Sequence, residues 1–211
     1  MMITGDDTTK QAASYLAEHD SALKPVIENV GLCTIRPHKN YYQELVESII
    51  SQQLSVKAAA TIFKRFKDLF GGGFPAPEEI LAKSIDELRS VGLSRGKAMY
   101  VRDLAQHVLD GKVRFDHLDS LSNEEIIREL TAVKGIGEWT AHMFMMFCMG
   151  RMDVLAHGDL GIKNGIQKLY SLDHQPSAQE VAAVAAKNNW HPYESIACWY
   201  VWKSLDNAPK S

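Results

Sequence analysis

The stretch LTAVKGIGEWTAHM, residues 130–143, holds two glycines two residues apart between two segments with helical patterning. Apolar residues spaced three and four apart predict a helix on each side. We expect Gly135 and Gly137 to adopt positive φ, and glycine also lets another molecule approach the backbone closely. Backbone N–H groups where a helix begins attract anions, so this turn is a candidate phosphate contact, with Lys134 adding charge. A tight turn between two helices without any ligand would use the same glycines.

Composition places the chain among ordinary folded proteins. Of its 211 residues, 45% are hydrophobic, which is enough for one domain or for two small lobes. Residues 1–20 are polar and acidic, unlike a secretory signal. The longest nearly apolar run, residues 141–149, falls well short of the roughly 20 residues of a membrane span. We expect a soluble intracellular monomer with no membrane contact, in cytoplasm or nucleoid if bacterial and in the nucleus if eukaryotic.

The three cysteines are Cys33, Cys148 and Cys198. They are widely spaced and odd in number, so they provide neither a zinc pattern nor the four thiolates of an iron–sulfur cluster. We expect reduced, mostly buried thiols and no iron–sulfur cluster.

The charge is unevenly distributed although the net charge is only −3. Basic residues gather in KAAATIFKRFK, residues 57–67, and in RSVGLSRGKAMYVR, residues 89–102, and neither stretch contains an acid. Acids gather in residues 6–20, Asp20 included, and in residues 116–129. An acidic shell with a localised basic face is compatible with DNA binding. Each basic cluster alone is also typical of a solvated helix face.

Almost every long segment has the helical period, which predicts an all-α fold. The polar SQQLS, residues 51–55, interrupts the apolar pattern of residues 42–70, so we expect two helices with a break there. Pro77 suits the first turn of a helix, and SIDE, residues 84–87, is a capping box. Further helices are expected at residues 9–19, 22–31, 122–133, 138–149, 160–170, 177–188 and 193–205.

The string LTAVKGIGEWTA resembles the helix-hairpin-helix motif that grips the DNA backbone. Five further stretches resemble, in order, the DNA-3-methyladenine glycosylase II type of the helix-hairpin-helix superfamily, in a short form without an N-terminal sheet domain. They are SIISQQLSVKAAATIFKRF, FPAPEEI, LRSVGLSRGKAMYVRDLA, RMDVLAHGDLGIKNG and WHPYESIACWYVWKSL. The resemblance covers residues 26–205 and implies one glycosylase domain, 1–211, with two helical subdomains flanking a cleft. Residues 43–150 would form the central subdomain carrying the hairpin (130–149), and residues 1–42 plus 151–211 the second.

The resemblance implies a monofunctional glycosylase that flips alkylated purines out of double-stranded DNA and hydrolyses their N-glycosidic bond in base excision repair. Asp159 falls on the position of the catalytic aspartate. A carboxylate there would stabilise the positive charge that develops on the sugar. At an effective dielectric near 20, a charge pair ~4 Å apart interacts by ~4 kcal/mol, roughly a thousandfold in rate. Asp159 also suits the cap of a helix that begins near Leu160, and it could do both.

An alkylated purine carries positive charge, so its pocket needs aromatic walls more than proton donors. The resemblance implies that Trp139 and Trp202 line this pocket, with Trp202 as the stacking partner. Met143, one turn after Trp139, is a further candidate for the wall. All three would otherwise simply fill the core. For Trp199, Met145, Met146 and Met149 we expect the core.

The resemblance assigns the DNA contacts to two segments. Gln53 falls on the wedge that fills the hole left by a flipped base, with Leu54 and Ser55 beside it; a polar kink without this role is the alternative. The hairpin contacts are Lys134, Gly135, Ile136, Gly137 and Thr140. A structural Na⁺ or K⁺ held by the backbone carbonyls of Thr131, Val133 and Ile136 is suggested as well, and no cofactor is required.

Superfamily members that also nick the strand carry a lysine two residues after the second glycine, where this chain has Trp139. No amine is therefore available for a Schiff base, and no lyase activity is expected. The chain also has Leu155-Ala156-His157 where a proline usually precedes the aspartate, which leaves the rigidity of that loop open. Two other functions stay open: a glycosylase-like protein that binds abasic or damaged DNA without excision, and a helical protein-interaction module.

Overall fold

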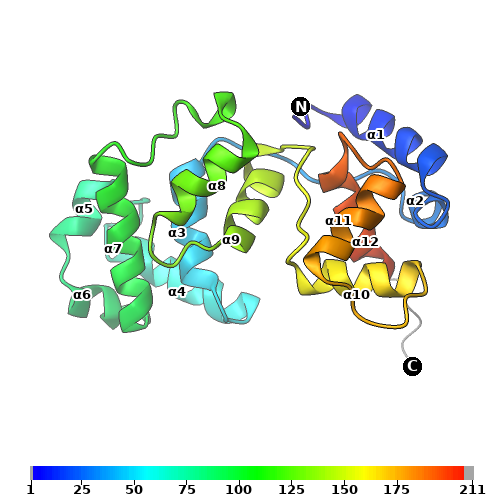
Figure 1. Ribbon diagram of the computed structural model, residues 1–211. Helices are drawn as coiled ribbons and strands as arrows, with labels where there is room; N and C mark the ends of the chain where they lie inside the picture. The colour runs from blue at the N-terminus through cyan, green and yellow to red at the C-terminus, as the bar shows by residue number, and fades with distance from the viewer. Residues whose placement is uncertain (1, 207–211) are drawn as a thin grey trace. The chain divides into compact units, whose positions relative to one another are not determined.

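The computed structural model describes residues 2–206, and every regular element in them is a helix, apart from one isolated bridge between Met2 and Arg151. The expected all-α fold is confirmed (Figure 1). The helices form two compact units, residues 2–39 with 145–206 (the first unit) and Asn40–Phe144 (the second unit). The expected division into subdomains of residues 43–150 and of residues 1–42 with 151–211 stays a prediction. None of the helices within residues 2–206 has the length and apolar character that a membrane span requires.

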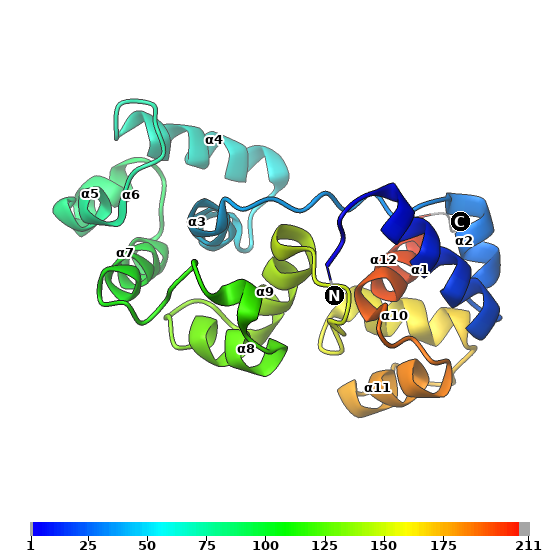
Figure 2. The ribbon, with the colours of Figure 1, turned by 90° about the horizontal axis from the view of Figure 1, so that it is seen from above.

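The first unit is built around its last helix. Its elements are α1 (Asp6–His19), α2 (Lys24–Val30), α10 (Leu160–Leu169), α11 (Ala178–Lys187) and α12 (Glu194–Asp206). Helix α12 contacts α1, α2 and α10 (Figure 2), and α11 contacts α10. The side chains of Trp190 and Tyr200 are completely buried in this core. The loop before α10 is thereby attached to a rigid group of helices.

A buried carboxylate lies in the first unit. Asp20 was expected in the acidic shell, but it is completely buried, so that expectation is wrong. One carboxylate oxygen accepts hydrogen bonds from the N–H groups of Ala22 and Leu23, at 2.9 and 3.1 Å. The other accepts from the Tyr170 hydroxyl and from Trp190 Nε1, the latter at 2.7 Å. A buried charge is tolerated when its lone pairs are satisfied in this way.

The second unit is built around α7 (Arg95–Leu109), which contacts α3 (Tyr41–Ser51), α5 (Pro77–Ala82) and α6 (Ile85–Ser90). Its other elements are α4 (Val56–Asp68), a 3-10 helix (Leu118–Ser120), α8 (Asn123–Thr131) and α9 (Glu138–Met143). The loop that joins α8 to α9 lies beside α7 and the C-terminal end of α3 (Figure 1). The expected break between α3 and α4 is confirmed.

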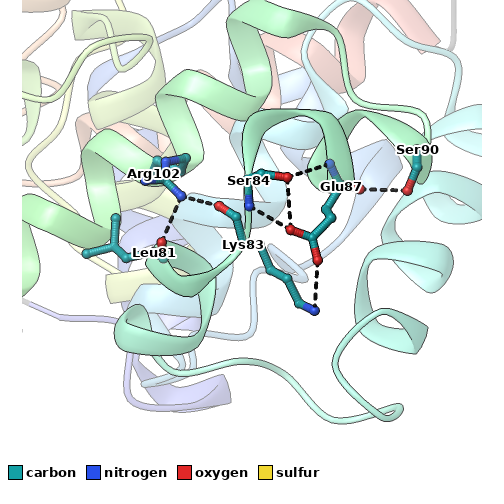
Figure 3. Close-up of polar contacts among 6 residues, drawn as sticks. All are labelled: Leu81, Lys83, Ser84, Glu87, Ser90 and Arg102. Atoms are coloured by element: carbon teal, nitrogen blue, oxygen red, sulfur yellow. Dashed lines mark hydrogen bonds and ion pairs between the residues drawn. The ribbon is translucent and has the colours of Figure 1, made fainter.

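Local capping signals were reliable in this unit. Pro77 opens α5, and Ser84 and Glu87 form the expected capping box of α6, which Figure 3 shows. The same figure shows Arg102 of α7 donating to the carbonyl oxygens of Leu81 and Lys83, where the chain passes from α5 to α6. Arg102 therefore fixes this connection instead of contributing to a basic surface.

The expected helix at 138–149 is present over its whole length, but its second half is not α-helical. Helix α9 ends at Met143, and residues Phe144–Met149 form a π-helix. Five of its six residues are buried, and only Phe147, with 38% of its surface exposed, reaches solvent. Since the segment FMMFCM contains no glycine, proline or polar residue, nothing in it indicates the wider turns. π-Helical turns inside helices are frequent near functional sites.

Candidate functional site

Asp159 is held from two sides. It is the N-cap of α10, and its Oδ1 accepts the N–H of Ile162 at 2.8 Å, so the expected capping role is confirmed. The same oxygen accepts a hydrogen bond from Trp202 Nε1 of α12, also at 2.8 Å. The carboxylate is half-buried. Two donors from two helices therefore fix the orientation of this side chain.

Hydrogen bonds hold the loop that leads to Asp159 in place, although this loop has no proline. At its start, the Gly150 carbonyl accepts the N–H of Ile3 at 2.7 Å. In its middle, the buried Ser195 of α12 accepts the N–H of Val154 at 3.1 Å and donates to the carbonyl of the same residue at 3.2 Å. At its end, the N–H of Asp159 bonds to the Ala156 carbonyl at 3.0 Å. These hydrogen bonds limit the motion of the loop.

Two glycines of α10 allow α12 to approach. A Cβ on Gly161 would lie 2.9 Å from both Cδ1 and Nε1 of Trp202 and 3.0 Å from the Asp159 carboxylate. A Cβ on Gly165, one turn later, would lie 2.4 Å from Val201. The hydrogen bond between Trp202 and Asp159 thus depends on the missing side chain at residue 161.

The indole of Trp202 also stacks on Phe147, with ring centroids 5.8 Å apart and an interplanar angle of 29°. One turn earlier on α12, burial, together with the charge of Asp159, raises the pKa of the Cys198 thiol to about 12. The thiol therefore stays neutral beside the carboxylate. The role of Trp202 as a stacking partner for a base stays a prediction.

Trp139 and Met143 belong to α9 in the second unit. The Trp139 side chain is 52% exposed, which excludes core filling, and Met143 is half-buried. By contrast, Trp199, Met145, Met146 and Met149 are at most 7% exposed, so their expected place in the core is confirmed. A large aromatic ring is therefore exposed just after the glycine turn. Its place in a base pocket stays a prediction.

The two glycines of the hairpin differ. Gly135 has φ 89°, as expected, but Gly137 has φ −97° and ψ 173°, which is extended backbone, so a positive φ at residue 137 was a wrong prediction. A Cβ on Gly135 would lie 2.3 Å from the Tyr100 ring, whereas one on Gly137 would meet nothing within 4 Å. Gly135 is needed for the fold of the turn, and Gly137 only leaves its surface open.

The polar groups of the hairpin are partly used within the protein. The N–H of Lys134 donates to Asp103 Oδ2 at 2.8 Å, and that of Ile136 to the Val133 carbonyl at 3.1 Å. In the described part of the chain, no hydrogen-bond acceptor is found for the N–H groups of Gly135 and Gly137. These two donors are the ones left for an external anion.

Burial separates the remaining hairpin candidates. Ile136 and Thr140 are buried, with 4% and 7% exposed, so their side chains offer almost no surface to a partner, whereas Lys134 is exposed. Thr131 is the last residue of α8 and Val133 lies just beyond its C-cap, where carbonyls lack helical partners. Such carbonyls suit a monovalent cation, and the Val133 oxygen, which accepts one N–H, keeps a second lone pair. The hairpin cation stays a prediction.

The turn between α3 and α4 carries the wedge candidates. Gln53 has φ 57°, in the left-handed region, and is exposed. Leu54 and Val56 are 38% and 89% exposed, which is unusual for apolar side chains. The Ser55 hydroxyl accepts the N–H of Ala58 at 3.3 Å as the cap of α4. The turn therefore presents Gln53 and two apolar side chains on a surface fixed by a capped helix.

The basic face is smaller than expected. Arg89 pairs with Asp86, Lys97 bonds to two backbone carbonyls, and Arg102 does the same. In the other cluster, Lys64 pairs with Asp68 at 2.8 Å. Cations that serve the fold contribute less to the attraction of DNA than their number suggests.

The sequence profile described as HhH-GPD superfamily base excision DNA repair protein matches residues 46–190. The chain belongs to this superfamily. Among curated proteins, this chain is 35% identical to DNA-3-methyladenine glycosylase 1 of Schizosaccharomyces pombe. The aligned 201 residues cover 92% of this chain and 86% of the relative.

Two solved structures of superfamily members are also similar. A DNA-3-methyladenine glycosidase from Bacillus halodurans has a TM-score of 0.84 at 37% identity, covering 98% of this chain and 92% of that one. The 3-methyladenine DNA glycosylase of Schizosaccharomyces pombe, in complex with abasic DNA, has a TM-score of 0.80 at 34% identity, covering 95% and 99%. The recognised family and fold are thereby confirmed.

Sequence reasoning missed three residues that contact or position other residues of the candidate site. Gly161, Ser195 and Phe147 hold or contact Asp159, its loop and Trp202. Only the glycines at 161 and 165 gave a signal, because small residues four apart allow two helices to approach closely. Ser195 and Phe147 are far from Asp159 in sequence, and no local pattern connects them.

Proposed function

We propose that this chain is a monofunctional DNA glycosylase that excises alkylated purines of the 3-methyladenine and 7-methylguanine class during base excision repair. The support is the superfamily membership together with relatives at 34–37% identity whose names specify 3-methyladenine. The observation that carries the proposal is the Asp159 carboxylate, oriented by Ile162 and Trp202 at the start of α10.

In the proposed reaction the target nucleotide is flipped out of the duplex, at a cost of a few kcal/mol. The C1′–N bond breaks, and the alkylated base leaves with the bonding electrons, which neutralise its positive charge. Asp159 stabilises the cation that develops on the deoxyribose. Water adds to C1′ and loses a proton, leaving an intact abasic site. No lysine stands where a lyase needs its nucleophile, since that position is Trp139.

The remaining site residues have proposed supporting roles. Trp202, Trp139 and Met143 would contact the extruded base, Gln53 would fill the gap in the duplex with Leu54 and Ser55 beside it, and the residues 134–137 with Thr140 would hold the backbone. Burial of the Ile136 and Thr140 side chains leaves them almost no surface for such contacts.

Incubating methylated duplex DNA with the protein and chromatographing the released bases tests the proposal. Free 3-methyladenine or 7-methylguanine with intact, alkali-sensitive DNA is the expected result. Strand cleavage without alkali would contradict the monofunctional assignment. A panel with ethenoadenine and hypoxanthine then defines the range of bases.

The second candidate function is a glycosylase-like protein that binds abasic or damaged DNA without excision. It predicts retention of lesion-containing DNA with no released base. A protein-interaction module predicts binding that is insensitive to salt, whereas phosphate contacts weaken steeply as salt rises. The oriented carboxylate of Asp159 favours the enzyme over both.

Gly161→Ala should lower base release about tenfold, because the new Cβ displaces Trp202 from Asp159 and one charge-assisted hydrogen bond is worth about 1.5–3 kcal/mol. Binding to abasic DNA should stay within about threefold, since the hairpin is untouched. Single-turnover release and fluorescence anisotropy measure the two quantities. Gly158→Ala is the matched control, as a Cβ there meets nothing within 4 Å. Equal losses in both variants would show that loop flexibility, and not the indole contact, sets the rate.

Gly137→Val should weaken binding to duplex DNA about tenfold or more without lowering the melting temperature. Valine readily adopts the extended backbone of residue 137. Its side chain would occupy the open space through which phosphate would approach. Gly135→Ala should lower both affinity and stability, because its Cβ collides with Tyr100. Anisotropy and thermal melting separate the two variants, with Gly73→Ala as control. Unchanged affinity in Gly137→Val would rule out the proposed backbone contact.

A further inference from the structure

One face of α7 touches both segments that the proposed function brings to DNA. Lys97, Tyr100 and Asp103 follow one another at intervals of three residues, which places them on the same side of the helix. Lys97 contacts the end of α3, immediately before the Gln53 turn, and the other two contact the hairpin. Nothing in the residue pattern of the hairpin or of the turn indicates this connection.

Lys97 closes the C-terminal end of α3. Its ammonium donates to the carbonyl oxygens of Ile50 at 2.9 Å and Gln52 at 2.6 Å. Terminal carbonyls lack helical donors, and a cation is favourable at this end of a helix. Burial lowers the pKa of Lys97. The lysine therefore gives up hydration to hold the carbonyl that directly precedes Gln53.

The hairpin rests on the next two side chains of the same face. The Tyr100 ring fills the space where a Cβ of Gly135 would lie, 2.3 Å from Cδ2. Asp103 accepts the N–H of Lys134 at 2.8 Å. Both contacts fix the backbone of the turn, and they leave the N–H groups of Gly135 and Gly137 without an internal acceptor among the described residues.

Gln52 joins the two segments directly. Its side-chain Nε2 donates to the Gly135 carbonyl at 2.8 Å, while its backbone carbonyl accepts from the Lys97 ammonium. A continuous path therefore runs from Lys97 through the backbone and side chain of Gln52 to the hairpin. Gln53, with its left-handed φ of 57°, is the next residue in the chain.

We propose that Lys97 and Gln52 are positioning residues that couple the grip of the hairpin on the backbone to the entry of the Gln53 turn into the duplex. This inference rests on the proposed function. Without the link, the hairpin still binds phosphate, but the turn no longer keeps a fixed distance from the bound backbone. Base flipping then falls while affinity is largely retained.

Lys97→Met and Gln52→Met test the link, because each keeps the approximate length of the side chain and removes its donors. The probe is a duplex with 2-aminopurine beside a tetrahydrofuran abasic site, and its fluorescence at saturating protein reports unstacking. We expect the flipping equilibrium to fall about tenfold in each variant, with affinity by anisotropy within about threefold. Lys97→Arg, which can also donate to two carbonyls, should restore most of the signal. The flipping equilibrium of the double variant should be no lower than that of the more impaired single variant, since the two substitutions interrupt the same path.

The controls separate this inference from the proposed function. Lys10→Met removes the charge of an exposed lysine of α1 and should behave as wild type. Wild-type flipping in Lys97→Met or Gln52→Met would overturn the coupling while base release by the wild type upholds the function. Losses that multiply in the double variant, or no rescue by arginine, would also overturn it. A wild-type protein that neither binds the duplex nor releases a base would instead overturn the proposed function.

Discussion

Asp159→Asn should reduce the release of alkylated bases by about a thousandfold, since a neutral amide removes the ~4 kcal/mol that a carboxylate ~4 Å from the sugar cation contributes. The fold should persist. An asparagine oxygen can still cap α10 through the N–H of Ile162 and accept from Trp202. Affinity for abasic duplex should therefore stay within about threefold. Single-turnover release with chromatographic detection, paired with anisotropy, measures both.

Asp173→Asn provides the matched control, because this exposed acid of the first unit loses the same charge outside the site. It should release bases at the wild-type rate. Full activity of Asp159→Asn would show that the carboxylate is not the catalytic group. Loss of both activity and affinity would instead mean that the substitution had disturbed the loop that carries residue 159.

Asp20→Asn should destabilise the protein by about 3 kcal/mol, because charge-assisted hydrogen bonds are worth about 1.5–3 kcal/mol and an unpaired buried donor adds about 1–3. Burial and the neighbouring Asp20 raise the pKa of Tyr170, so its phenol remains a donor. An amide cannot accept from both Tyr170 and Trp190 while it also accepts from Ala22 and Leu23. For a chain of this length, the melting temperature should drop by about 6–12 °C.

Thermal melting followed by circular dichroism and by the fluorescence of the tryptophans checks this result. Glu18→Gln, an exposed acid on α1, is the control and should melt within about 1 °C of wild type. A melting temperature of Asp20→Asn equal to that control would mean that the buried carboxylate stabilises nothing beyond what an amide provides.

Sequence patterns predicted the features of this fold that are determined locally. SQQLS separates α3 from α4, and SIDE caps α6, because turn and capping preferences act within a few residues. The π-helix Phe144–Met149 was not predicted, since its uniformly apolar sequence favours no helical period over another. Asp20 was misplaced at the surface because its partners Tyr170 and Trp190 lie 150 and 170 residues away.

The candidate site shows the same limit. Asp159 was singled out by the resemblance to the glycosylase family, and its catalytic role stays a prediction, whereas its cap is a local contact. The bond to Trp202 spans 43 residues and depends on Gly161. The glycines at 161 and 165 indicate close packing of a helix, but they do not indicate that Trp202 is the partner. Likewise, the sequence places Lys97 in a basic cluster, whereas in the structure its ammonium donates to the carbonyls of Ile50 and Gln52. Tertiary contacts, and not local propensity, assign these side chains.

The left-handed backbone of Gln53 limits how this protein can be re-engineered. Glycine, asparagine and aspartate tolerate that conformation, whereas branched or bulky replacements pay a penalty of about 1–2 kcal/mol. In a library randomised at residue 53 alone, many variants would thus be destabilised by the backbone conformation, whatever their ability to insert into the duplex. Exchanging neighbouring Leu54 instead would vary the inserted bulk without that penalty.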